Sequence, residues 1–90
     1  MEEKAIVKFL NKETGKCEEL EIPLDITAND LIIALNEVYQ LGMDIENIFS
    51  CYLVAENPIA FLHGNNELLK FGIRNGTIII FKGDKNELSL

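Results

Sequence analysis

Only one stretch of this 90-residue chain has the apolar spacing of an amphipathic helix, and it lies near residues 28–41. Leucine, isoleucine, valine and tyrosine recur there at intervals of three and four residues. Thr27 precedes the stretch as a helix N-cap, and Asp30 three positions later completes a capping-box pattern. Gly42 follows the last periodic residue, where a helix often ends in a left-handed residue. The rest of the chain must therefore provide the apolar cover for a single helix.

The residues before this helix alternate between apolar and charged side chains, which is the period of a half-buried β-strand. Two such runs, residues 4–10 and 18–24, flank a short turn that contains Gly15. They predict an antiparallel hairpin, in which Pro23 ends its strand or lies at a sheet edge because it has no N–H group to donate. The side chains predicted to face inward are Ala5, Val7, Phe9, Leu20, Ile22 and Leu24.

Short apolar runs separated by proline, glycine and asparagine make up the second half of the chain. The predicted elements are strands at 49–54, 59–62 and 77–81 and one helical turn at 68–73. Gly72 closes the helical turn, and the dipeptide Asn75-Gly76 predicts a tight turn before the last strand.

This order of elements, a hairpin, one helix and then short strands, predicts an α+β fold of the β-grasp, or ubiquitin-like, class. We expect a mixed sheet of roughly four or five strands with the helix across one face and the last strand parallel to the first. Residues 1–82 are expected to form this domain, and residues 83–90 are expected to form a polar C-terminal tail.

The segment before the last predicted strand carries a more specific pattern. Leu68, Phe71 and Ile73 have the spacing of ubiquitin-like domains, and the Gly-Ile-x-Asn-Gly sequence at 72–76 resembles the YukD/EsaB group. That group consists of small ubiquitin-like proteins of the Gram-positive type VII (Esx) secretion system, and the resemblance extends over residues 4–81. The matching positions shape the fold and include no catalytic motif.

The charge balance excludes several classes of function. Eight lysine and arginine residues against fifteen aspartate and glutamate residues give a formal net charge of −7 at pH 7. Binding to nucleic acid or to an anionic membrane surface depends on positive charge, so both are disfavoured. No apolar run approaches the roughly 20 residues of a membrane span, and the acidic start has no signal-peptide pattern. We therefore expect a cytoplasmic protein that is recruited to the inner face of the membrane only by protein partners.

No residue pattern predicts catalysis or metal binding. Cys17 and Cys51 are too far apart for a CxxC pair, and with the single His63 they cannot supply four zinc ligands or hold an iron–sulfur cluster. Covalent modifiers and sulfur carriers end in Gly-Gly, whereas this chain ends Glu-Leu-Ser-Leu and has one nearby glycine, Gly83. We expect no enzyme activity, no cofactor, no metal and no small-molecule substrate.

With catalysis, metal binding and nucleic-acid binding disfavoured, docking on a protein partner is the function that we expect. The alternation in two neighbouring predicted strands suggests where this docking occurs. The side chains predicted to face inward are Phe49, Cys51, Leu53, Ile78 and Ile80. The side chains predicted to form an outward apolar patch are Tyr52, Val54, Ile79 and Phe81. Two alternatives stay open: the C-terminal tail covers this patch, or the register is shifted by one and these residues belong to the core.

The resemblance implies a non-catalytic ubiquitin-like adaptor of a type VII secretion system. It also implies partners among the cytoplasmic domains of the membrane-embedded machine, such as its pseudokinase-like or ATPase component. One alternative is a ubiquitin-like interaction domain of an unrelated assembly. A processed covalent modifier or sulfur carrier is the other alternative.

Overall fold

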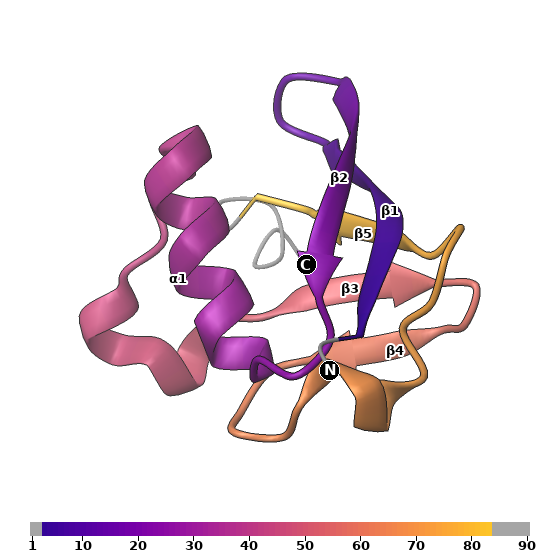
Figure 1. The fold of residues 1–90 in the computed structure, drawn as a ribbon. Helices are drawn as coiled ribbons and strands as arrows, with labels where there is room; N and C mark the ends of the chain where they lie inside the picture. The colour runs from indigo at the N-terminus through magenta and orange to yellow at the C-terminus, as the bar shows by residue number, and fades with distance from the viewer. Residues whose placement is uncertain (1–2, 84–90) are drawn as a thin grey trace.

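The computed structural model describes residues 3–83 and contains a mixed β-sheet with one α-helix packed across one face (Figure 1). In chain order the elements are β1 (Lys4–Asn11), β2 (Lys16–Pro23), α1 (Ala28–Tyr39), the 3₁₀ helix η1 (Ile45–Ser50), β3 (Leu53–Glu56), β4 (Ala60–Leu62), the 3₁₀ helix η2 (Leu68–Phe71) and β5 (Ile78–Phe81). The sheet has five strands in the order β2-β1-β5-β3-β4. β5 runs parallel to β1, and the other strand pairs are antiparallel. This is the predicted β-grasp arrangement.

The N-terminal hairpin follows the alternation of the sequence. The six predicted inward residues lie on the face that α1 covers, and all are buried except Leu20, which is half-buried. Pro23 is the last residue of β2, and β2 is an edge strand, as the missing N–H group predicts. Gly15 has a φ of 79° in the turn, a conformation that glycine adopts without strain.

The helix begins as predicted and ends two residues earlier than expected. The Thr27 hydroxyl accepts a hydrogen bond from the Asp30 N–H group, and the Asp30 carboxylate accepts one from the Thr27 N–H group, which completes the capping box. At the other end, Gln40 rather than Gly42 is the left-handed C-cap residue. Asn36 explains this early end, because its backbone oxygen accepts from the Gln40 N–H group and its side chain accepts from the Met43 N–H group at 2.8 Å.

The strand predicted at 49–54 is wrong in its first half. Residues Ile45–Ser50 form η1, and β3 begins only at Leu53. The side chain of Phe49 was predicted to face inward and is instead 82% exposed. Turn hydrogen bonds within the segment account for the difference, since the Ser50 hydroxyl and the Cys51 N–H group donate back to the carbonyl oxygens of residues 47 and 48. Cys51 and Leu53 are buried, as predicted.

The last third of the chain follows the prediction more closely. η2 closes on Gly72, which has a φ of 80° and is left-handed. The Gly76 N–H group donates to the carbonyl oxygen of Ile6, so the turn before β5 is anchored to the first strand. β5 then pairs in parallel with β1, with Phe9 opposite Ile79. The predicted C-terminal tail, apart from Gly83, lies outside the described residues.

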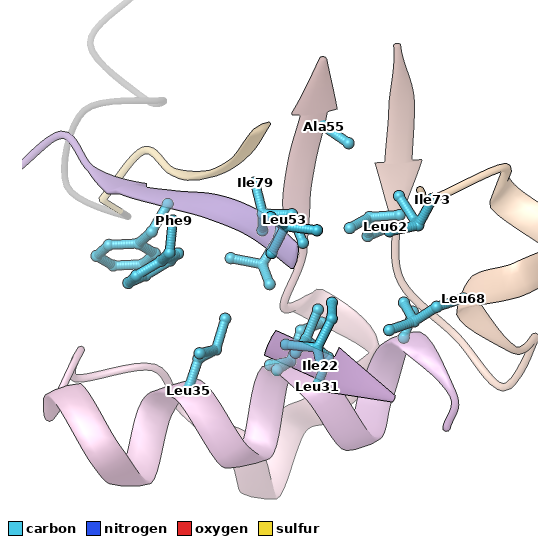
Figure 2. Close-up of a cluster of buried hydrophobic side chains, with 14 of the residues drawn as sticks. Phe9, Ile22, Leu31, Leu35, Leu53, Ala55, Leu62, Leu68, Ile73 and Ile79 are labelled. Carbon is cyan, nitrogen blue, oxygen red and sulfur yellow. The ribbon is translucent and has the colours of Figure 1, made fainter. Parts of the chain in front are cut away.

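One apolar core lies between the sheet and α1 (Figure 2). Leu31 and Leu35 reach up from the helix, and Phe9, Leu53 and Ile79 meet them from the sheet. Within residues 3–83, no buried side-chain nitrogen or oxygen atom lacks a hydrogen-bond partner. No helix in this part of the chain is long and apolar enough to cross a membrane.

Candidate functional site on the outer face of the sheet

The face of the sheet that α1 does not cover is defined by the register of β5. Ile79 lies opposite Phe9 on one side and Ala55 on the other, and both of these partners are buried on the helix side. Ile79 is therefore 1% exposed and Phe81 is 3% exposed, and Figure 2 shows Ile79 within the core. The prediction that Ile79 and Phe81 face outward is wrong.

The composition of β5 explains this error. Residues Ile78–Phe81 are all apolar, so no polar side chain marks which face meets water. β5 is also the central strand, between β1 and β3, and it pairs with neighbours on both edges. A continuous apolar run is typical of such a strand, and it fits either register equally well.

Tyr52 and Val54 face outward, as predicted. Val54 lies opposite Ile80 on β5 and opposite Phe61 on β4, and Ile80 lies opposite Leu10 on β1. These residues form one apolar row that crosses four of the five strands. We call the following residues the outer-face patch: Leu10, Tyr52, Val54, Phe61, Ile78 and Ile80. Ile80 in the middle is 4% exposed, whereas Phe61 at the β4 end is 53% exposed.

Aromatic rings make up the β4 end of the outer-face patch. The rings of Tyr52 and Phe61 stack with their centroids 4.6 Å apart and their planes at 22°. The His63 ring meets the edge of Phe61 with a centroid distance of 5.0 Å. The two rings restrict each other's motion, so this end of the patch is ordered without a ligand.

Charged residues border the outer-face patch. Lys8 of β1 lies opposite Ile78 of β5 on one side and opposite Glu19 of β2 on the other. Glu56 of β3 also lies opposite Ile78. Glu21 continues the acidic side of β2 on the same face. An apolar centre with a charged border is the usual composition of a protein–protein contact, in which the border selects the partner and the centre supplies affinity.

Sequence reasoning missed the residues of the patch other than Tyr52 and Val54. Phe61 carried a usable signal, because Ala60 and Leu62 alternate with it in a three-residue strand. Leu10 is the fourth outward residue of β1, after Lys4, Ile6 and Lys8, so alternation alone places it on the outer face. Ile80 carried no signal, because its neighbours in β5 are as apolar as it is.

The polar chemistry of the described residues is sparse. Within residues 3–83, no group of three histidine, cysteine, aspartate or glutamate side chains is placed to hold a metal ion. Cys17 is exposed and Cys51 is buried, and they form no disulfide with each other. The Tyr39 hydroxyl donates to Oε1 of Glu18 at 2.8 Å. Partial burial, then this hydrogen bond and the negative charge of Glu18, raises the pKa of Tyr39 above its ordinary value of 10.0.

Several solved structures resemble this chain, and they are ubiquitin-like domains. The ubiquitin-like domain of tubulin-binding cofactor B superposes with a TM-score of 0.76 at 21% identity, covering 97% of this chain and 97% of that one. The C-terminal ubiquitin-like domain of mouse tubulin-specific chaperone e gives 0.70 at 11% identity, covering 92% and 89%. The ubiquitin-like domain of Plasmodium falciparum Dsk2 gives 0.58 at 20% identity, covering 87% and 97%.

No protein-family model and no curated protein matches the sequence. The structural similarity therefore concerns the fold, and at these identities it establishes the ubiquitin-like β-grasp and not a shared activity.

Proposed function

We propose that this chain is a non-catalytic docking module that binds a partner protein through the outer-face patch. One observation carries the proposal: an apolar row with stacked aromatic rings crosses the sheet face that α1 leaves uncovered, and Phe61 is 53% exposed there. The other members of the patch are half-buried, apart from the buried Ile80, so Phe61 is the part of the row that water reaches most. Apolar side chains grouped at an exposed edge in this way commonly mark contact sites.

The proposed mechanism separates affinity from selection. The apolar row would be dehydrated on contact, with Phe61 and Tyr52 as aromatic anchors of the kind enriched at protein interfaces. The charges of Lys8, Glu19 and Glu56 at the border would remain partly solvated. They would act on partner choice and association rate more than on affinity.

We further propose that the chain belongs to a type VII secretion system. It would be an accessory protein on the cytoplasmic side that docks on cytoplasmic domains of the membrane-embedded machine. The support is the resemblance of the Gly-Ile-x-Asn-Gly sequence at 72–76 to the YukD/EsaB group. In the fold, these residues form the left-handed end of η2 and the turn that leads into β5.

A calorimetric titration tests this proposal. The chain is titrated with the purified cytoplasmic domain of the secretion ATPase, or of the pseudokinase-like component, encoded in the same genome. We expect a saturable complex with the unchanged chain. Phe61→Ser should weaken it by about 2 kcal/mol, roughly thirtyfold in Kd, because an aromatic anchor is lost.

Phe49→Ser is the matched control, because it removes the same side chain from an 82% exposed position on η1, away from the outer face. It should bind like the unchanged chain. If Phe49→Ser weakens binding and Phe61→Ser does not, the docking face is on the helical side of the molecule. If neither domain binds the unchanged chain, the assignment to the secretion system is wrong, and the outer-face patch must be tested with another partner.

A further inference from the structure

The β1–β2 hairpin carries polar residues on the face of the sheet that α1 covers. The C-terminal end of α1 lies on this side of the hairpin (Figure 1). Glu18 lies opposite Phe9 on the side of the sheet that α1 covers, and Lys16 lies opposite Asn11 two positions further on. The helix ends at Tyr39, and the hydroxyl of this last residue reaches Glu18.

A pocket of about 200 Å³ opens at this place. The residues that line it are Phe9, Asn11, Thr14, Lys16, Glu18 and Tyr39. The rings of Phe9 and Tyr39 form its apolar side, with centroids 5.0 Å apart and planes tilted by 39°. Phe9 is almost fully buried, so the aromatic surface that a ligand meets belongs mainly to Tyr39.

The pocket holds one oriented carboxylate. Oε1 of Glu18 accepts the hydrogen bond of the Tyr39 hydroxyl at 2.8 Å, which fixes the carboxylate next to the ring. Among the residues that the structure describes, Oε2 of Glu18 accepts no hydrogen bond and Glu18 forms no ion pair. Lys16 lies on the same face of the same strand, yet its ammonium group forms no ion pair with the Glu18 carboxylate.

We propose that this pocket binds the guanidinium group of an arginine side chain from a partner protein. A guanidinium group is planar and weakly hydrated, so it stacks on an aromatic face while donating two N–H groups to a carboxylate. Tyr39 and Glu18 provide that ring and that carboxylate side by side. The net charge of −7 favours the approach of a cation.

Lys16 gives this inference a distinctive consequence. The Lys16 ammonium group at the pocket repels any cation, so removal of this charge should strengthen arginine binding. The same removal would weaken the binding of an anion or a zwitterion. The pocket lies on the helix side of the sheet, opposite the outer-face patch, so the inference does not depend on the function proposed for that patch.

An NMR titration of the full chain tests the inference, with N-acetyl-arginine methylamide as the probe and the uncharged isostere N-acetyl-citrulline methylamide as its comparator. We expect saturable shifts at Glu18 and Tyr39 with the arginine probe and none with the citrulline probe. Glu18→Gln should weaken arginine binding about tenfold, as expected for the loss of a charge-assisted hydrogen bond. Lys16→Gln should strengthen it about threefold through the loss of a repelling charge.

Glu19→Gln is the matched control, because it removes the same charge from the next residue of β2, which faces the outer side. It should leave the affinity unchanged. Equal shifts with the arginine and citrulline probes would overturn the inference, and so would the absence of shifts at Glu18 and Tyr39. A loss in Glu19→Gln as large as in Glu18→Gln, or weaker binding in Lys16→Gln, would overturn it as well.

Discussion

Ile79 and Ile80 are neighbours in β5 and face opposite sides of the sheet. Ile79 packs in the core under α1, while Ile80 lies between Leu10 and Val54 in the outer-face patch. One position along the strand therefore separates a side chain in the core under α1 from a side chain in the middle of the outer-face patch, where Ile80 is 4% exposed. The same period of two separates Glu18, next to Tyr39, from Glu19 on the outer face.

Substitution at two adjacent isoleucines tests the register of β5. Ile79→Ser should lower the free energy of unfolding by roughly 3–5 kcal/mol, because it leaves a cavity and buries a hydroxyl group. Ile78→Ser, at a half-buried position on the outer face, should cost less than about 1.5 kcal/mol. Denaturant unfolding measures both values. Equal losses, or a larger loss at Ile78, would contradict the register.

Tyr39 predicts a pH dependence in the alkaline range. Its pKa is raised in the folded chain, so the folded state holds the phenolic proton more tightly than the unfolded state does. The resulting contribution to stability is fully present below about pH 10 and is lost as the pH rises through the folded pKa.

Tyr39→Phe removes this contribution. The variant should be less stable than the unchanged chain near neutral pH, by less than about 1 kcal/mol because the hydrogen bond is partly solvated. Its stability should also fall less steeply above pH 10. Unfolding curves between pH 8 and pH 11 measure the difference, and parallel pH profiles for the two chains would contradict the account.

At the scale of elements, the sequence predicts best where polar residues mark the solvent side. Lys4 and Lys8 of β1 and Glu19 and Glu21 of β2 mark the outer face of the hairpin, and the capping box at Thr27 marks where α1 starts. Prediction fails where that contrast is missing. β5 is apolar throughout, and Phe49 in η1 is an apolar side chain at the surface, a position that patterning assigns to the core.

In the candidate site, too, alternation with buried residues predicts some members, while others depend on how the strands pair. The outward positions of Tyr52 and Val54 follow from their alternation with Cys51 and Leu53, which are buried. The pairing of β3 with β4 and β5 adds Phe61 and Ile80, and this pairing depends on contacts between distant segments. The pocket beside Glu18 and Tyr39 depends in the same way on where α1 ends relative to the hairpin, which the local pattern does not determine.

A leucine-to-alanine and a valine-to-alanine substitution test which face of α1 packs on the sheet. Leu35 is 6% exposed and faces the core, whereas Val38 is 70% exposed on the same helix. Leu35→Ala should cost about 2–5 kcal/mol of unfolding free energy, the usual loss for a buried leucine. Val38→Ala should stay within about 0.5 kcal/mol of the unchanged chain. Thermal or denaturant unfolding compares them, and a costlier Val38→Ala would mean that a different face of the helix is buried.

At the scale of the whole molecule, the sheet has two faces with different roles. α1 closes one face and makes the single core between sheet and helix. The other face carries the outer-face patch, an apolar row with an aromatic end and a charged border. The net charge of −7 gives the chain a long-range electrostatic preference for basic molecules.

The most direct test of this account is a map of backbone amide chemical shifts in the chain while the purified secretion-system domain is added. We expect the largest perturbations to cluster on β3, β4 and β5 around Val54, Phe61 and Ile80, with α1 and η1 little affected. Perturbations centred on α1 and on Phe49 in η1, with the outer face of the sheet unchanged, would contradict the account.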